Sequence, residues 1–162
     1  MRTRGWLAGT VAVSVLIAAS LRGVARRFAI REASMAPTLA DGDWVVARRS
    51  TGPLDRGDVV ILPDPAGSGM HLVKRVIGLP GETMGIDGGR VTVDGALLAD
   101  RWANGMTRPD GIWEVGDDQV WLLGDNRAHS VSDGRVLGPT DVADIEWVVA
   151  ARYWPRDRMG RG

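Results

Sequence analysis

The sequence predicts a mainly β, antiparallel domain, built as a barrel-like or folded sheet with a small hairpin lobe, behind one N-terminal transmembrane helix. Beyond residue 31, short apolar runs alternate with Gly, Asp and Pro, and no stretch keeps a helical period over twelve residues. The 22 glycines favour tight turns over long helices. With the N-terminal segment set aside, the chain has room for one domain of roughly 130 residues.

The predicted membrane helix begins the chain. Residues 6–21 read WLAGTVAVSVLIAASL, with arginines on both sides. As a helix this run is roughly 24 Å long, against a hydrocarbon core of ~30 Å. Snorkelling arginines and continuation through residues 23–25 supply the difference, so we expect residues 1–27 to form an anchor. A cleaved secretory signal is the alternative, because residues 18–20 are small. The flanking arginines do not decide the orientation of the helix.

The predicted strands follow in short succession and are separated by turn sequences. Asp-Gly at 87–88 and 94–95 indicates hairpins, and Pro80-Gly81 indicates a reverse turn. We assign residues 28–155 to the β-rich domain, residues 82–118 within it to an inserted hairpin lobe, and residues 156–162 to a basic tail. The strands are expected at residues 28–31, 44–48, 59–62, 71–77, 90–93, 112–115, 119–123 and 145–153.

Composition argues against several kinds of function. Residues 1–31 hold six arginines and no acid, so the rest of the chain is acidic, which is unlike a nucleic-acid-binding domain. The chain has no cysteine, so it forms no disulfide and no cysteine-ligated zinc site. It carries no HExxH, CxxC or phosphate-binding glycine motif. We therefore expect no metal, no other cofactor, no nucleotide and no nucleic acid partner.

Ser34 and Lys74 are the candidates for chemistry. Ser34 lies between a predicted strand and Pro37, and a serine needs a base to act as a nucleophile. Lys74 is the only lysine beside nineteen arginines. Strand alternation puts it on one face with apolar neighbours, which lowers a lysine's pKa. Lowering the pKa of this lysine by ~3, which takes about 4 kcal/mol, would leave a useful fraction of the amine neutral near pH 7. A lone lysine in so arginine-rich a chain is also compatible with accident, and His71 and His129 are alternative bases.

Five sequence blocks together resemble the signal peptidase I family, the membrane-bound leader peptidases with a serine–lysine dyad. They come in the family's order and reach from residue 6 to about residue 140. The lysine block and the GDNR block are long and specific. The blocks are the apolar anchor; SMAPTL at 34–39 with GDWVV at 42–46; RGDVV at 56–60; KRVIGLPGE at 74–82; and GDNR at 124–127, leading to Ser130.

The resemblance implies a role for each matching residue. Ser34 would attack the scissile carbonyl, Lys74 would be the general base, and Ser130 would orient the lysine. An extended substrate would lie between the strand before Ser34 and the strand that carries Lys74. The supporting ionic network would be Arg75, Asp125, Asp133 and Arg135, and the pockets for small substrate side chains would be lined by Ile30, Met35, Leu39, Leu72 and Val73.

The chain departs from the family's pattern in three places. Glu32 stands where the family commonly has a serine or glycine that helps to build the oxyanion hole. The last block, SVSDGR at 130–135, is one residue longer than usual, so Ser132 competes with Ser130 for the lysine-orienting role. The lobe between the lysine block and GDNR is short, as in the smaller members.

These patterns predict a membrane-anchored serine endopeptidase that cleaves signal peptides from exported preproteins. Its partners would be preproteins and the lipid bilayer, and it would cross the cell membrane once, with the catalytic domain on the extracytoplasmic side. A dedicated maturation protease for one precursor is a second hypothesis, motivated by Glu32 and the short lobe. A catalytically impaired, membrane-tethered β binding domain is the third. The apolar N-terminus and the lack of a helical DNA-binding domain argue against a soluble self-cleaving repressor.

Overall fold

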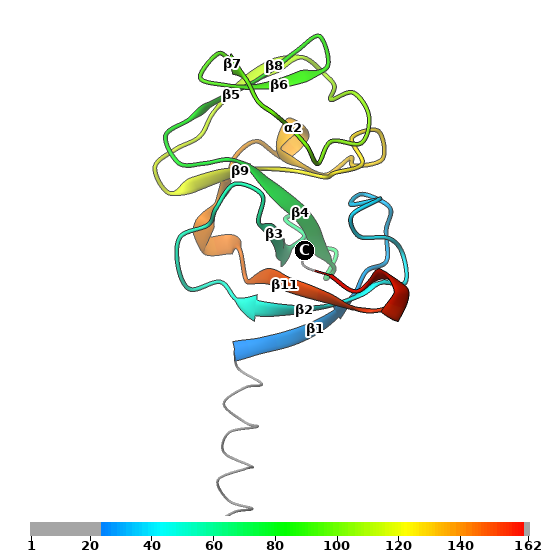
Figure 1. The fold of residues 1–162 in the computed structure, drawn as a ribbon. Helices are drawn as coiled ribbons and strands as arrows, with labels where there is room; N and C mark the ends of the chain where they lie inside the picture. Colours follow the sequence, from blue (N-terminus) through cyan, green and yellow to red (C-terminus); the bar gives the residue numbers. More distant parts are fainter. Residues whose placement is uncertain (1–23, 161–162) are drawn as a thin grey trace, which may run out of the picture.

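A computed structural model describes residues 24–160, which fold mainly as short β-strands (Figure 1). Three short helical segments accompany the strands: α2 (Gly134–Leu137) and the 3₁₀ turns η1 (Val142–Asp144) and η2 (Arg156–Arg158). The strands are β1 (Ala25–Ala29), β2 (Trp44–Arg49), β3 (Val59–Pro63), β4 (His71–Gly78), β5 (Thr83–Asp87), β6 (Arg90–Val93), β7 (Ala96–Leu97), β8 (Gly111–Glu114), β9 (Gln119–Leu123), β10 (Thr140–Asp141) and β11 (Trp147–Trp154).

The strands form two antiparallel sheets. The larger has seven strands in the order β1-β2-β11-β3-β4-β9-β10, and the smaller has four in the order β7-β6-β5-β8. A barrel closes only when its two edge strands pair. Here β10 is two residues long, between Pro139 and η1, and within residues 24–160 it does not pair with β1. The mainly β, antiparallel prediction is therefore confirmed, whereas the barrel alternative is wrong.

Strand β3 lies at the centre of the core because it is buried on both faces. Its sequence VVIL is apolar throughout, as expected of a strand without a solvent-facing side. Val59 and Ile61 pack in one apolar cluster with Ile30, Met35 and Leu39. Val60 and Leu62 point the other way into a second cluster with Val76 and Leu122. The next strand, β4, therefore pairs with a strand that is buried on both faces.

The smaller sheet is inserted between β4 and β9 and falls within residues 82–118 (Figure 1). Its strands β5 and β7 are additions to the predicted set, as is β10 in the larger sheet. Met84 packs against the larger sheet at Gly78, where a Cβ would lie 2.7 Å from the methionine side chain and 2.8 Å from Trp121. Trp113 of β8 also contacts Trp121, with ring centroids 5.0 Å apart. A third apolar cluster joins the two sheets in this way.

Both ends of the described chain are structured. Strand β1 starts at Ala25, three residues before the predicted strand, and so includes the end of the predicted anchor. The remainder of that anchor lies outside the described residues, and no helix within residues 24–160 has the length and apolar character needed to span a bilayer. In the predicted basic tail, η2 turns the chain back so that Gly160 pairs with Arg152.

Candidate active site

Ser34 lies in the loop that connects β1 to β2, which we call the nucleophile loop (residues 30–43). The loop has no regular secondary structure, but it is held by backbone hydrogen bonds from Ala36 N to Ala33 O (3.1 Å) and from Leu39 N to Met35 O (2.9 Å). Ser34 is 8% exposed. Within residues 24–160 its backbone N–H donates no hydrogen bond, so it remains available to an oxygen atom of a substrate.

Lys74 lies in β4 and is buried, with 3% of its surface exposed. Burial lowers the pKa of its amine, because a charged ammonium loses its water. The negative charges of Asp133 and Glu32 oppose this effect, and the positive charge of Arg135 adds to it; the net result is a lowered pKa. The fold therefore raises the fraction of neutral amine above that of an exposed lysine, and the neutral amine is the form that a general base requires.

A chain of hydrogen bonds fixes the lysine head group. Lys74 Nζ donates to Ser130 Oγ at 3.2 Å, and Ser130 Oγ donates to Asp133 Oδ2 at 2.6 Å. Asp133 in turn accepts from Arg135 Nε at 2.9 Å and from Gly124 N at 3.2 Å. Burial alone would raise the pKa of Asp133, but the hydrogen bonds from Arg135, Ser130 and Gly124 together lower it. The carboxylate thus stays ionised and holds the hydroxyl of Ser130 in one orientation.

Ser132 occupies a different position from Ser130. It lines a very small hollow beside Lys74, together with Asp133 and Thr140. Among the described residues, the side-chain hydrogen bond of Lys74 goes to Ser130 and none goes to Ser132. Asp133 of this block caps the N-terminus of α2, since its carboxylate accepts from the Arg135 backbone N–H at 3.2 Å.

Arg75 and Asp125 form the second buried pair near the site. Two hydrogen bonds of 2.8 Å join the guanidinium to the carboxylate, and Arg75 Nη1 donates to Gly57 O at 2.6 Å. Consecutive residues in a strand point to opposite faces, so Arg75 projects away from Lys74. This pair joins β4 to the loop after β9, and within residues 24–160 its side chains make no hydrogen bond to Ser34 or Lys74.

The GDNR loop (residues 124–127) holds the nucleophile loop in place. Asn126 N donates to Ser34 O at 3.0 Å, and Asn126 Nδ2 donates to Ala33 O at 3.1 Å. Gly124 lies between Ser34 and Ser130: a Cβ there would be 2.6 Å from Ser34 O and 2.4 Å from Ser130 Oγ. Sequence reasoning gave Gly124 and Asn126 no role of their own, although the GDNR block was the signal that could have found them.

Ser34 and Lys74 are connected through Gly124 and Ser130, without a direct hydrogen bond among the described residues. The hydrogen bonds among residues 24–160 do not include one between Ser34 Oγ and Lys74 Nζ. The two alternative bases also make no bond to Ser34 there: His71 packs against the ring of Phe28, and His129 Nδ1 lies 3.1 Å from Asn126 Oδ1. What joins Ser34 to Lys74 is the sequence of contacts through Gly124 and Ser130.

A pocket of about 270 Å³ opens beside Ser34, between the end of β1 and the start of β4. Ile30, Met35, Leu72 and Val73 line it, as the resemblance implied. Leu39 does not: it is 1% exposed and packs in the core with Val45 and Val59. Of β4, residues 71–74 pair only with β3, and β1 pairs only with β2, so each described strand presents a free edge. An extended peptide can pair with such edges.

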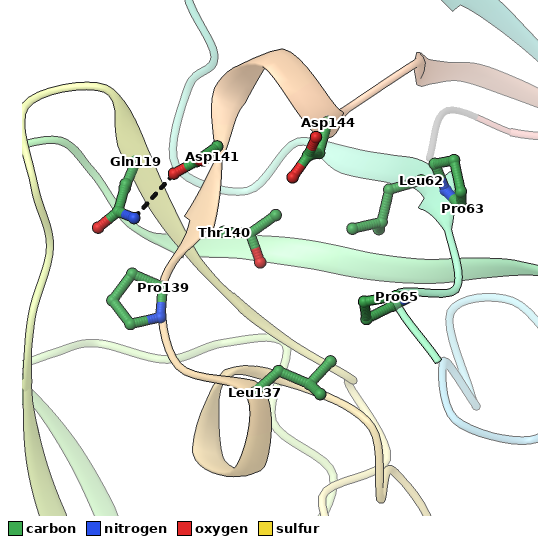
Figure 2. Close-up of a pocket in the computed structure, with 9 residues that line it drawn as sticks. All are labelled: Leu62, Pro63, Pro65, Gln119, Leu137, Pro139, Thr140, Asp141 and Asp144. Carbon is green, nitrogen blue, oxygen red and sulfur yellow. Dashed lines mark hydrogen bonds between the residues drawn. The ribbon is translucent and has the colours of Figure 1, made fainter. Parts of the chain in front are cut away.

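A larger hollow, of about 420 Å³, lies elsewhere on the larger sheet and is bordered by α2, β10 and η1 (Figure 2). Gln119 and Asp141 are hydrogen-bonded on one side of it at 2.8 Å. Neither Ser34 nor Lys74 lines this hollow. Its size alone therefore does not make it the candidate active site, because Ser34 lines the smaller pocket instead.

Comparison with known proteins identifies similar chains. The family model described as "Signal peptidase, peptidase S26" matches residues 3–154, as far as the last residue of β11. A signal peptidase I of Leptolyngbya laminosa is 33% identical over 171 residues, covering 93% of this chain and 80% of that protein. The mitochondrial inner membrane protease subunit 1 of Schizosaccharomyces pombe is 36% identical over 128 residues, covering 75% of this chain and 69% of that protein.

The chain is also similar to several solved structures, one of which illustrates the match. That structure is a signal peptidase I from Enterococcus faecalis, with a TM-score of 0.52 and 26% sequence identity. The superposition covers 60% of this chain and 97% of that chain. The comparison of sequences and the comparison of structures therefore both find signal peptidases.

Proposed function

The chain belongs to the signal peptidase family, peptidase S26, and from this premise we propose that it is a membrane-anchored serine endopeptidase that removes signal peptides from exported preproteins. The observation that carries the proposal is the buried Lys74, with a lowered pKa and an amine held by Ser130, beside a pocket that contains Ser34. The anchor would be residues 1–27, and the catalytic domain would face the extracytoplasmic side.

The proposed reaction uses Lys74 in both of its steps, the acylation and the deacylation of Ser34. The neutral amine takes the proton of Ser34 Oγ as this oxygen attacks the scissile carbonyl carbon. The resulting ammonium gives the proton to the leaving amine when the peptide C–N bond breaks, which leaves an acyl group on Ser34. A water molecule, deprotonated by the same amine, then attacks the acyl carbon. The bond from this carbon to Ser34 Oγ breaks, the ammonium returns the proton to this oxygen, and the signal peptide leaves with a new C-terminal carboxyl group. Ser130 keeps the lysine head group oriented in each step.

The oxyanion formed by this attack needs hydrogen-bond donors. The Ser34 N–H is one, because it donates to no described residue. Glu32 is exposed, and an ionised carboxylate has no proton to donate, so its side chain does not replace the hydroxyl that the family commonly has there. One oxyanion donor is worth about 3 kcal/mol in the transition state. We therefore expect this chain to hydrolyse substrates more slowly than relatives with a serine at that position.

Substrate selection follows from the pocket. Its lining is mainly apolar and its volume is about 270 Å³, which suits apolar side chains next to the cleaved bond. The free edges of β1 and β4 offer main-chain hydrogen bonds to an extended segment of any sequence. The chain would therefore recognise signal peptides in general, through their extended shape and the side chains next to the cleaved bond.

A dedicated maturation protease for one precursor is the second candidate. The similarity to a subunit of a mitochondrial inner membrane protease supports it, together with the exposed Glu32 near the pocket. Incubation with a panel of unrelated preproteins distinguishes the two, because cleavage of most of the panel would exclude the specialist. The missing Ser34–Lys74 hydrogen bond favours a third candidate, a catalytically impaired binding domain, which acylation of Ser34 by a serine-directed inhibitor would exclude.

Substitution of the dyad tests the proposed chemistry. Ser34→Ala removes the nucleophile, and Lys74→Arg replaces the base by a group that stays charged at neutral pH. Both variants should lose cleavage of a model preprotein while keeping the circular dichroism spectrum of the unsubstituted chain. Ser50→Ala, in the loop between β2 and β3, is the matched control and should cleave normally. Full activity of Lys74→Arg would refute the dyad.

A further inference from the structure

Asp43 is a buried carboxylate at the far end of the nucleophile loop. It is 1% exposed, although its Gly-Asp sequence reads as an ordinary turn. Its backbone oxygen accepts from Ile30 N at 2.8 Å, and its side chain accepts from Ala40 N at 2.9 Å. Ile30 lines the pocket on the N-terminal side of Ser34, and Ala40 lies on its C-terminal side. Asp43 therefore fixes the loop on both sides of Ser34.

Two arginines near the C-terminus bind the same carboxylate. Arg158 Nη1 lies 3.1 Å from Asp43 Oδ1, and Arg152 Nη1 lies 3.4 Å from Asp43 Oδ2. Each arginine also donates to a carbonyl oxygen in the loop itself. Arg158 Nη2 donates to Pro37 O at 2.9 Å, and Arg152 Nη1 donates to Thr38 O. These contacts join residues more than a hundred positions apart in the sequence.

The C-terminal segment is itself anchored in the position that these contacts need. Arg152 belongs to β11, and its backbone exchanges hydrogen bonds with Gly160 in both directions, at 2.8 and 3.1 Å. Its Nε donates to Arg158 O. The 3₁₀ turn η2 thus presents Arg158 to a loop that has no sheet or helix of its own to hold it. Pro37 is only three residues from Ser34, so a shift of its carbonyl moves the nucleophile.

We propose that Arg158 is a positioning residue for the nucleophile: by bridging Asp43 and Pro37 O, the C-terminal segment sets the place of Ser34 relative to Lys74. This inference rests on the proposed function of Ser34. The role requires arginine, because a guanidinium presents a planar fork of donors that reaches two acceptors at once, whereas the lysine ammonium acts as a single point charge. The segment predicted as a basic tail is then part of the catalytic architecture.

The test compares three variants of the full chain in detergent. Arg158→Ala removes the bridge, and Arg158→Lys keeps the charge while losing the fork. Arg156→Ala is the matched control, because Arg156 lies in the same 3₁₀ turn, is exposed, and makes no side-chain hydrogen bond or ion pair within residues 24–160. Cleavage of a model preprotein gives kcat and KM, thermal unfolding gives the folded fraction, and hydrogen exchange follows the amides of Leu39 and Asp43.

We expect Arg158→Ala to lower kcat ten- to a hundredfold with KM within threefold of the unsubstituted chain, because misplacing a reacting group by about 1 Å costs on the order of a hundredfold. The Leu39 and Asp43 amides should exchange at least tenfold faster, and Arg158→Lys should be intermediate in both readouts. Arg156→Ala should change neither. Equal kcat values for Arg158→Ala and Arg156→Ala would overturn the inference.

Two further outcomes are decisive. If Arg158→Ala does not fold, Arg158→Lys carries the test, and normal kcat in that variant overturns the role of the fork. If the unsubstituted chain cleaves no preprotein, the proposed function fails, but hydrogen exchange still tests the contact because it requires no activity. Unchanged exchange of Leu39 and Asp43 in Arg158→Ala would then overturn the positioning of the loop by Arg158.

Discussion

Replacing Ser130 by alanine tests most directly how the buried lysine is made to act. The substitution removes the 3.2 Å bond that Ser130 Oγ accepts from Lys74 Nζ and the 2.6 Å bond that it donates to Asp133. Asp133 keeps its bonds from Arg135 and Gly124, so the carboxylate stays paired and the domain should fold. The principal loss is the fixed direction of the lysine amine.

The size of this loss follows from two terms. A neutral hydrogen bond contributes about 1 kcal/mol net. A lysine side chain has about 2 kcal/mol of rotamer entropy. In the unsubstituted enzyme this entropy is lost on folding, whereas in Ser130→Ala the lysine head group is free and the entropy is lost only in the transition state. Together these give about 3 kcal/mol in the transition state, or about a hundredfold in kcat/KM. Stability should fall by about 3 kcal/mol, since two hydrogen bonds are lost and one of them goes to a carboxylate.

The assay is steady-state cleavage of a model preprotein by Ser130→Ala and by Ser132→Ala. Ser132 lies two residues away and lines the hollow beside Lys74, but it accepts no hydrogen bond from the lysine within residues 24–160. Ser132→Ala should therefore retain a kcat/KM within about threefold of that of the unsubstituted chain. The reasoning fails if Ser132→Ala loses as much activity as Ser130→Ala, or if Ser130→Ala cleaves normally.

Three other substitutions address the lysine's pKa, the contact at Gly124 and the pocket. Activity should rise with pH through the pKa of Lys74, which lies below the ordinary lysine value of about 10.4. Because the charge of Glu32 raises this pKa, Glu32→Gln should move the acid limb of the kcat/KM profile to lower pH. The control Glu114→Gln, on the smaller sheet, should leave the profile unchanged. Gly124→Ala should lower kcat/KM by about a hundredfold or more, since its Cβ would displace both Ser34 and Ser130, and Gly52→Ala, with nothing within 4 Å, should have no effect in the same cleavage assay. Val73→Trp should raise KM for preproteins about tenfold by filling the pocket beside Ser34, and an unchanged KM would show that substrates bind elsewhere.

The lowered pKa of Lys74 also has a consequence for stability. The unfolded chain, with an ordinary lysine pKa, binds a proton over a pH range in which the folded chain does not. Stability from this group therefore rises with pH between the folded and the unfolded pKa of Lys74. Asp133 has the usual behaviour of a paired carboxylate: its contribution is present above its unfolded pKa and is lost as pH falls through the lower folded value.

Much of the local structure could be predicted because it depends on neighbouring residues. The run VVIL in β3 is apolar at every position, and the structure buries all four side chains. The position of Lys74 among apolar residues in β4 predicted its burial and the direction of its pKa shift. Strand β5 was missed because Gly85 and the charged Asp87 weaken its pattern, and only pairing with β6 and β8 on its two sides stabilises it.

The β class, the family resemblance and the candidate pair Ser34 and Lys74 could be inferred from the sequence, since each depends on residue type and local spacing. Four other features required the folded chain: the serine that the lysine binds, the open larger sheet, the packing of Leu39 in the core, and the contact of Arg158 with the loop of Ser34. Each of these depends on contacts between segments far apart in the chain. Spacing along a sequence does not encode the distance between such segments, because that distance is set by the packing of the whole domain.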